Sequence, residues 1–154
     1  MKKIIIAASF VVFTVSAFFI ATDSNAFFGP WASKHQKVDA VNGMVTIPVN
    51  KIDDGKAHYF SFKAQGKEIK FFVLKSRDGI IRAAFDTCDV CFPEKKGYSQ
   101  SGDFMVCNNC GQRFHSTKIN VIKGGCNPAP LRRVNNGNEL VISANDIFTG
   151  FRYF

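Results

Sequence analysis

Signals of several common protein classes are missing from this chain. Its 154 residues contain no Ser/His/Asp set, no paired-carboxylate motif, no phosphate-binding glycine loop and no basic helix. Hydrolytic catalysis and nucleotide binding therefore have no support. Apolar residues nowhere recur at helical spacing over three turns in 40–154, which argues against a helical bundle. Apart from two cysteine pairs, there is no internal repeat and no low-complexity segment.

Cysteine is absent from the N-terminal segment 1–26, which excludes lipid attachment at a lipoprotein-type site. Lys2 and Lys3 precede an apolar run, Ile4–Ala21, which is followed by a Ser24–Ala26 ending of small residues. This pattern predicts an export signal and hence a periplasmic protein. The run is also near the length that spans a bilayer, so an uncleaved anchor that tethers the protein is the alternative. No second run of that length follows, so we expect the rest of the chain to be soluble.

The composition is basic and sufficiently apolar for one ordinary domain. The hydrophobic content of 46% is enough to build a core without help from disulfides. The formal net charge is +8. We expect no nucleic-acid partner, because an exported protein rarely meets one. The charge favours association with an anionic membrane surface or an acidic protein, and it also serves solubility.

Short strands separated by turn dipeptides predict an all-β domain over 40–154. Expected strands cover 43–49, 58–64, 68–76 and 80–85, followed by one hairpin within 98–106 and another within 131–143. Pro48 confines the first of these strands to a sheet edge. The strand 68–76 is apolar on both faces, so we expect it to be central. Residues 144–148 are expected to form at most one helical turn, and 27–39 a tail or linker with His35 on the surface.

All five cysteines lie within 88–131. They form two Cys-x-x-Cys pairs fifteen residues apart, followed by a lone cysteine: Cys88 with Cys91, Cys107 with Cys110, and Cys126. Two intervening residues let both sulfurs of a pair converge on one ion, and the longer loop can fold back to complete a tetrahedron. The spacing predicts a metal site on the two pairs. Cys126 is a candidate fifth ligand, a substitute for a pair member, or a free or disulfide-forming thiol.

Disulfide bonds are the competing interpretation of the cysteines, because an exported protein meets an oxidising compartment. Against it, the number of cysteines is odd, and all of them lie in the last two-fifths of a chain with an ample core. A disulfide-stapled protein is normally shorter and spreads its cysteines through the fold.

Three residues near the second pair are weaker candidates for a supporting role. Gly111 allows a turn in which amide groups point at thiolate sulfur, and Arg113 offsets the charge of four thiolates. His115 is a candidate ligand or proton acceptor. Four thiolates bind zinc, a single iron or a [2Fe–2S] cluster with the same residue types, so spacing leaves the metal open.

The run AFDTCDVCFPEKKGYSQSGDFMVCNNCGQRF from Ala84, followed by GGCNPAPL, resembles the FtrD-like family of membrane-associated iron–sulfur proteins, whose function is poorly known. The resemblance covers roughly residues 40–145. It implies an iron–sulfur cluster, [2Fe–2S] in our prediction, on the two cysteine pairs, with Cys126 in the third cysteine motif of the family. It also implies electron transfer on the outer side of the cytoplasmic membrane, beside ferrous-iron uptake systems in some bacteria. Several relatives carry multiple membrane spans, whereas this chain has at most one.

A more distant resemblance is to Rieske-type domains. It rests on a hairpin, the pattern C-x2-C-G-x-x-F from Cys107, and a Gly/Pro loop that ends in P-x-P-L. It implies Rieske-like or rubredoxin-like metal-binding loops at one end of the domain. Rieske proteins have histidine as the second member of each pair, where this chain has Cys91 and Cys110. An all-thiolate site is expected to have a lower reduction potential.

Taken together, these features predict an electron carrier rather than an enzyme, with a membrane redox protein or a metal-transport permease as its partner. A periplasmic thiol–disulfide redox protein is the first alternative. That chemistry requires a cysteine at a helix N-terminus, whereas both pairs here follow predicted strands. A structural zinc-binding interaction module is the second alternative, and it would have no redox chemistry.

Overall fold

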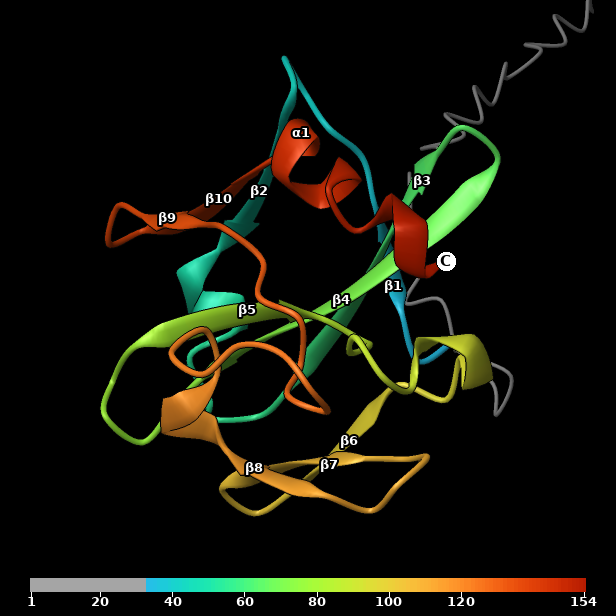
Figure 1. The fold of residues 1–154 in the computed structure, drawn as a ribbon. Helices are drawn as coiled ribbons and strands as arrows, with labels where there is room; N and C mark the ends of the chain where they lie inside the picture. The colour runs from blue at the N-terminus through green and yellow to red at the C-terminus, as the bar shows by residue number, and fades with distance from the viewer. Residues whose placement is uncertain (1–32) are drawn as a thin grey trace, which may run out of the picture. The chain divides into compact units, whose positions relative to one another are not determined.

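The computed structural model describes residues 33–154 (Figure 1). The predicted export signal and residues 27–32 of the predicted tail lie outside the described residues. Within 33–154, no helix has both the length and the apolar content that a membrane crossing requires.

The described chain contains ten short strands, one short α-helix and four 3₁₀ helices. The strands are β1 Gln36–Val38, β2 Met44–Pro48, β3 His58–Ala64, β4 Lys67–Lys75, β5 Ile81–Phe85, β6 Tyr98–Ser101, β7 Phe104–Cys107, β8 Arg113–His115, β9 Val134–Asn135 and β10 Glu139–Ser143. The α-helix is α1 Ala144–Phe148, and the 3₁₀ helices are η1 Val49–Lys51, η2 Phe92–Glu94, η3 Ser116–Lys118 and η4 Phe151–Tyr153. The predicted all-β class is confirmed.

The strands form three sheets, in the orders β1-β3-β4-β5, β2-β10-β9 and β6-β7-β8. All pairings are antiparallel except the short β1–β3 pair. Pro48 ends an edge strand, since β2 pairs only with β10 within its sheet, and the edge position predicted from this proline is confirmed. Strand β4 lies between β3 and β5, as its two apolar faces predicted.

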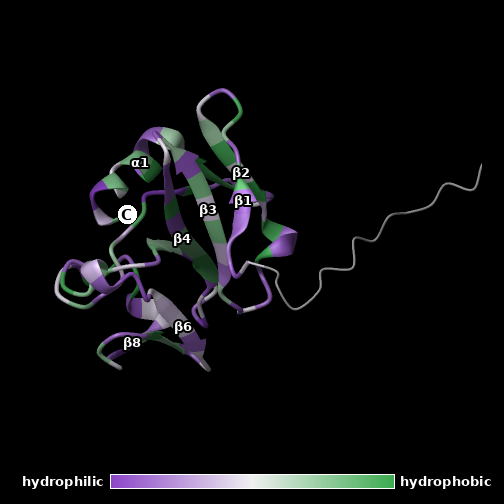
Figure 2. Cartoon of the chain, turned by 90° about the vertical axis from the view of Figure 1, so that its right-hand side faces the viewer, coloured by the Kyte–Doolittle hydropathy of each residue, from purple (hydrophilic) through white to green (hydrophobic). Residues whose placement is uncertain are grey.

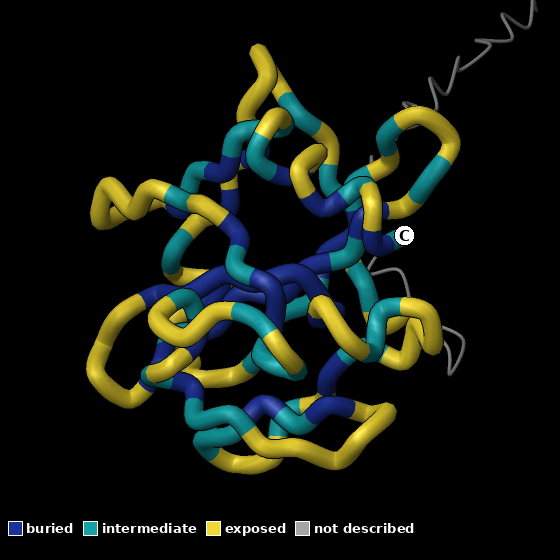
Figure 3. Tube along the Cα trace, in the orientation of Figure 1, coloured by how far each residue is buried: buried dark blue, intermediate teal, exposed yellow. Residues whose placement is uncertain are grey.

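Each face of β4 packs into a different core. Ile69, Phe71 and Val73 point into the first core, which β2 and β10 complete from the other side. Phe72 and Leu74 point into the second core, together with residues of β6 and β7. The four-stranded sheet therefore lies between the other two, with β2, β9 and β10 above it and β6 to β8 below it in Figure 1. Figure 3 shows the buried residues concentrated along this middle layer.

Alternation of side chains explains why the strands fold onto the first core. On β10, Leu140 and Ile142 are fully buried while the residues between them are not. Figure 2 shows the same alternation of hydrophobic and hydrophilic residues along β3. The chain then enters α1, where the Ser143 hydroxyl accepts a hydrogen bond from the amide of Asp146 at 3.2 Å.

The structure differs from the prediction of a tail over 27–39. Gln36–Val38 form β1 and pair with β3 in the register Gln36 to Phe60. His35 is mostly buried rather than on the surface, and its Nε2 lies 2.8 Å from Asp86. A strand of three residues is too short to show a period in the sequence, so its pairing could not be read there. Strand β1 therefore precedes residue 40, where the domain was predicted to begin, and is paired with a strand of that domain.

Backbone hydrogen bonds bring two distant segments together, the end of β5 and the Gly/Pro loop 124–131. The Gly/Pro loop runs beside the end of β5: the amide of Phe85 donates to Ala129, and the amide of Ala129 donates to Thr87, at 2.8 and 2.9 Å. The amide of Leu131 also donates to Ala83, at 3.2 Å. The end of β5, which leads to the first cysteine pair, is thereby fixed beside the loop that carries the lone cysteine.

Candidate metal centre

The first cysteine pair lies in the loop that follows β5. Cys88 is 1% exposed and belongs to the second core, whereas Cys91 is half-buried. The amide of Cys91 donates a hydrogen bond of 3.1 Å to the sulfur of Cys88. This is the tight knuckle that a spacing of two residues permits, and such a bond stabilises a thiolate.

The second pair lies in the turn between β7 and β8. Cys107 is the buried last residue of β7, and Cys110 is exposed. Gly111 adopts φ +74° and donates its amide to the carbonyl of Cys107 at 2.9 Å, so it makes the turn and does not itself bond a sulfur. The amide that bonds the Cys110 sulfur belongs to Gln112, and this bond lowers the pKa of Cys110.

Cys126 is delivered to the same place by the Gly/Pro loop. Its sulfur lies 3.9 Å from the sulfur of Cys91. Its carbonyl accepts a hydrogen bond of 2.5 Å from the hydroxyl of Tyr98, the β6 residue directly opposite Cys107. Tyr98 is itself 1% exposed. One buried tyrosine therefore connects the third cysteine segment to the second.

The five cysteines, which we call the cysteine site, form two overlapping groups of sulfurs. In each group all sulfurs lie within 4.8 Å of one another; the groups are Cys88, Cys91 and Cys126, and Cys91, Cys107 and Cys110. Two sulfurs on one tetrahedral metal are about 3.8 Å apart for a metal–sulfur bond of about 2.3 Å. A disulfide would need about 2.05 Å. The 3.9 Å separation of Cys91 and Cys126 is a non-bonded contact, too long for a disulfide and short enough for both sulfurs to reach one metal ion.

A comparison with protein families decides the relationship of the chain. The family model described as "Membrane iron-sulfur containing protein FtrD-like" matches residues 52–154. The chain belongs to the FtrD-like family. A comparison with curated proteins and one with solved structures found no match.

The donor set of this FtrD-like protein fits the iron–sulfur group that the family description names. Thiolate sulfur is the ligand that iron–sulfur clusters use, and the two groups consist of cysteines alone within residues 33–154. Two amide hydrogen bonds already point at sulfurs of the site, one at Cys88 and one at Cys110. The residues present could therefore hold such a metal group.

The pKa values show what the cysteine site requires electrostatically. The hydrogen bond from the Asn109 side chain is the largest single influence on Cys91 and lowers its pKa. Burial and the neighbouring thiols outweigh this bond and raise the pKa of Cys91 to about 12. Burial also raises the pKa of Cys126. Crowded thiols resist losing their protons because the resulting charges would repel, and a bound cation is what removes that penalty.

Arg113 and His115 were predicted to support the cysteine site, but the contacts that the structure shows for them are with other residues. The Arg113 guanidinium stacks over the ring of Phe104, 4.7 Å from its centroid. His115 packs edge-on against the same ring, and its Nδ1 lies 2.9 Å from the hydroxyl of Thr117 at the start of η3. His115 is in neither group of sulfurs. Both residues therefore serve the packing of β8 and its continuation in this structure.

Sequence reasoning missed the polar residues that hold the loops in place. Lys96 donates to the side-chain oxygen of Asn109 at 3.0 Å, which leaves the amide nitrogen for the Cys91 thiol. Gly97 has φ +64°, and a Cβ there would lie 2.6 Å from the carboxylate of Asp86. The available signal was Gly97 itself, a glycine in the polar loop between the two pairs, but its neighbour Asp86 is eleven positions away.

Proposed function

We propose that this protein is an exported iron–sulfur electron carrier whose cysteine site holds a [2Fe–2S] cluster. The observation that carries the proposal is the convergence of five sulfurs from three separate loops into two groups that share Cys91. The proposed ligands are Cys88, Cys91, Cys107 and Cys110, with Cys126 as a fifth thiol beside Cys91.

An iron–sulfur cluster supplies reversible one-electron transfer when it is bound. The chain's own residues create the conditions for this chemistry. Cys88 and Cys107 are almost completely buried, and the ring of Tyr98 packs beside them, which keeps water from one side of the site. The amides of Cys91 and Gln112 donate to sulfur and favour the thiolate state.

Cys110 makes the site accessible from one side. It is the only exposed cysteine among the five, and it lies at the tip of the turn between β7 and β8. A redox partner that docks at this turn would come closest to the metal group through Cys110. We propose a membrane redox protein or a metal-transport permease as that partner, in keeping with the family description and with the export signal predicted for residues 1–26. Under this proposal the protein is a carrier and catalyses no reaction alone.

Two other functions remain distinct outcomes of the same test. A structural zinc site would use the same thiolates without redox chemistry. A thiol–disulfide protein would use a reactive pair, and Cys91 with Cys126, whose sulfurs lie 3.9 Å apart, is one such pair across loops. A reactive pair of thiols would leave the other three cysteines of the site without a role.

Metal and sulfide analysis of anaerobically purified protein tests the proposal. We expect iron with an equimolar amount of acid-labile sulfide, and an electron paramagnetic resonance signal that appears on reduction. Iron without sulfide would indicate a mononuclear centre. Zinc alone, or a metal-free protein with an alkylatable Cys-x-x-Cys pair, would overturn the electron-carrier proposal.

A further inference from the structure

A cationic cavity borders the first cysteine loop, and no cysteine is among the residues that line it. Its volume is about 350 Å³, which is at the lower end of the range of about 300–1,000 Å³ found for small-molecule sites. Five lysines line it, Lys34, Lys67, Lys70, Lys95 and Lys96, together with His35. Only two acidic residues, Glu68 and Asp86, do so. The lining is therefore strongly unbalanced in charge.

The charge of Asp86 is already used within the protein. Its carboxylate is 3% exposed and lies 3.2 Å from the Nζ of Lys34 and 2.8 Å from the Nε2 of His35. It also accepts a hydrogen bond of 2.7 Å from the amide of Tyr98. Because Asp86 already forms an ion pair with Lys34 and two further hydrogen bonds, its single charge is shared among partners other than Lys70 and Lys95. Glu68 is exposed, and it forms no ion pair within the described part of the chain.

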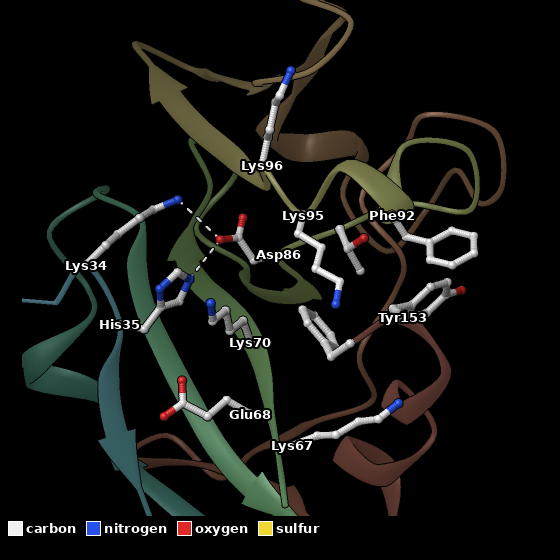
Figure 4. A pocket seen from close by; sticks show the side chains of 12 residues that line it. Lys34, His35, Lys67, Glu68, Lys70, Asp86, Phe92, Lys95, Lys96 and Tyr153 are labelled. Carbon is white, nitrogen blue, oxygen red and sulfur yellow. Dashed lines mark hydrogen bonds and ion pairs between the residues drawn. The ribbon is translucent and has the colours of Figure 1, made fainter.

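Two ammonium groups point into the cavity without an internal partner. Figure 4 shows the nitrogen of Lys95 directed toward the middle of the lining residues and that of Lys70 beside His35, whereas the nitrogen of Lys96 points away, toward its hydrogen bond with Asn109. Neither Lys70 nor Lys95 takes part in an ion pair or a side-chain hydrogen bond within residues 33–154. Lys70 is half-buried and Lys95 is exposed, so both ammonium groups are free to pair with an anion that enters the cavity.

The backbones that carry these two lysines are fixed. Lys70 is on the central strand β4, and its carbonyl accepts a hydrogen bond of 2.9 Å from the amide of Asp86. Lys95 has φ +52° directly after η2, and its amide donates to Phe92 at 3.2 Å. The backbone on both sides of the proposed ligand is therefore ordered before binding, and only the lysine side chains have to be fixed by it.

The remaining wall of the cavity is aromatic. Phe92, Tyr153 and Phe154 contribute to its lining, and the ring of Tyr153 packs edge-on against that of Phe92 at 5.8 Å. A bare inorganic ion would use only the lysines. An organic anion could place its carbon skeleton against the rings and its charged groups near the ammonium nitrogens.

We infer that this cavity binds a small organic anion with two or more carboxylate or phosphate groups. Lys70 and Lys95 pair with the acidic groups, and the aromatic wall contacts the carbon skeleton. The ligand lies against the first cysteine loop, since Asp86 and Thr87 precede Cys88 and line the cavity. This inference is separate from the proposed function, because it does not depend on which metal, if any, the cysteines hold.

Isothermal titration calorimetry on the full-length protein in mild detergent tests the inference. Tricarballylate serves as the carboxylate probe and glucose-1,6-bisphosphate as the phosphate probe, with acetate as a single-charge comparison. We expect one of the two polyanions to bind with a dissociation constant below about 1 mM, and acetate to bind far more weakly. The probe that binds more tightly identifies the acidic group. No saturable binding of either polyanion would overturn the inference.

Paired substitutions locate the site. Lys70→Gln combined with Lys95→Gln is expected to weaken binding by at least about tenfold, because it removes two charge-assisted contacts. The matched control changes Lys37→Gln and Lys63→Gln, two exposed lysines on β1 and β3 outside the cavity lining, and is expected to stay within about twofold. Equal weakening in both double variants would show binding to overall charge only and would contradict the inference.

Two further readouts keep the result interpretable. Lys95→Gln alone changes an exposed residue that folding does not depend on, so it remains available if the double variant does not fold. Metal content is measured in every sample. If anion affinity is lost while the metal content is unchanged, the cavity and the cysteine site are separate. If a metal-free protein still binds the anion, the inference holds even where the proposed function is wrong.

Discussion

The two ends of the domain are held together in different ways. The first core contains sixteen buried residues, all of them aliphatic or aromatic, and no cysteine. The second core contains eight, and two of these, Cys88 and Cys107, belong to the cysteine site. Cys91 and Cys126 pack against the same core from its edge. The first end is thus stabilised by apolar burial, whereas the second depends on the groups that are proposed to bind metal.

The two faces of the four-stranded sheet therefore have different roles: one packs into the first core, which provides stability, and the other into the second core, which contains cysteines of the cysteine site. Strand β4 contributes to both cores, so the first end provides a fixed support for the second. Where ligands come together only in the folded state, the free energy of metal binding is also free energy of folding. We therefore expect the β6–β8 end to loosen without metal while the first core stays intact.

Substitution of Cys91 is expected to give the largest difference in effect between the two ends of the domain. It belongs to both groups of sulfurs, so Cys91→Ser removes a donor from each. We expect metal affinity to fall by more than about 100-fold, because changes that only affect residues outside a ligand set already cost about 10- to 100-fold. Metal analysis of the purified variant measures this, and hydrogen exchange should show lost protection confined to β6–β8.

Cys126→Ser is the comparison for Cys91. Cys126 belongs to only one group and carries a raised pKa. We expect this variant to retain metal, with a smaller loss of affinity than Cys91→Ser. Equal loss in the two variants would show that Cys126 is an obligatory ligand and would revise the ligand set.

Phe71 and Phe72 are neighbours on β4 that point into different cores. Phe71→Ala is expected to lower the free energy of unfolding by about 3–5 kcal/mol with or without metal. Phe72→Ala should cost a similar amount in the metal-bound protein and clearly less in the metal-free protein, where the second core is already loosened. Urea unfolding of each variant in both states provides the measurement. An identical loss of unfolding free energy for Phe72→Ala in the two states would contradict the claim that the second core loosens without metal.

Gly97 and Gly102 test the polar support of the cysteine end. Both have positive φ, so Ala at either position costs about 1–2 kcal/mol. At Gly97 a Cβ would also meet the Asp86 carboxylate at 2.6 Å, whereas Gly102 has open space. Overpacking of this kind adds about 1–3 kcal/mol. The midpoint of thermal unfolding should therefore be clearly lower for Gly97→Ala than for Gly102→Ala. Equal midpoints would show that Asp86 moves aside without a cost in stability.

Asp78, in the turn between β4 and β5, gives the smallest expected effect. Hydrogen bonds from Ser76 and Arg82 hold the pKa of Asp78 at about 2 in the folded protein. A carboxylate with a lowered folded pKa stabilises the fold above its unfolded pKa, about 3.9, and this contribution is lost as pH falls through about 2. Urea midpoints measured from pH 5 down to pH 2 should fall less steeply for Asp78→Asn than for the unsubstituted protein. Parallel curves for the two proteins would contradict this.

The sequence predicted the elements that depend on local pattern. The alternation over 58–64 and the two apolar faces of 68–76 correspond to β3 and β4, and 144–148 forms the one helical turn allowed for it. The spacing of the two cysteine pairs predicted that they meet, and Cys91 lies beside Cys107 and Cys110, whereas Cys88 is grouped with Cys91 and Cys126. Each of these signals lies within a short window of residues, where periodicity and reach are informative.

Contacts between distant segments could not be predicted. Cys126 reaches Cys91 because the Gly/Pro loop pairs with the end of β5, a choice of partner that the loop sequence does not specify. His35 reaches Asp86 across 51 positions, and its strand β1 is too short to show a period. These contacts depend on which chain segments lie side by side, and local propensity carries no information on that.

X-ray absorption at the iron K-edge of the anaerobically purified protein tests the central claim most directly. The account predicts that sulfur alone surrounds the iron and that a second iron contributes to the scattering, as a [2Fe–2S] cluster on cysteine thiolates requires. An iron edge with nitrogen or oxygen ligands, or no iron above background, would contradict it.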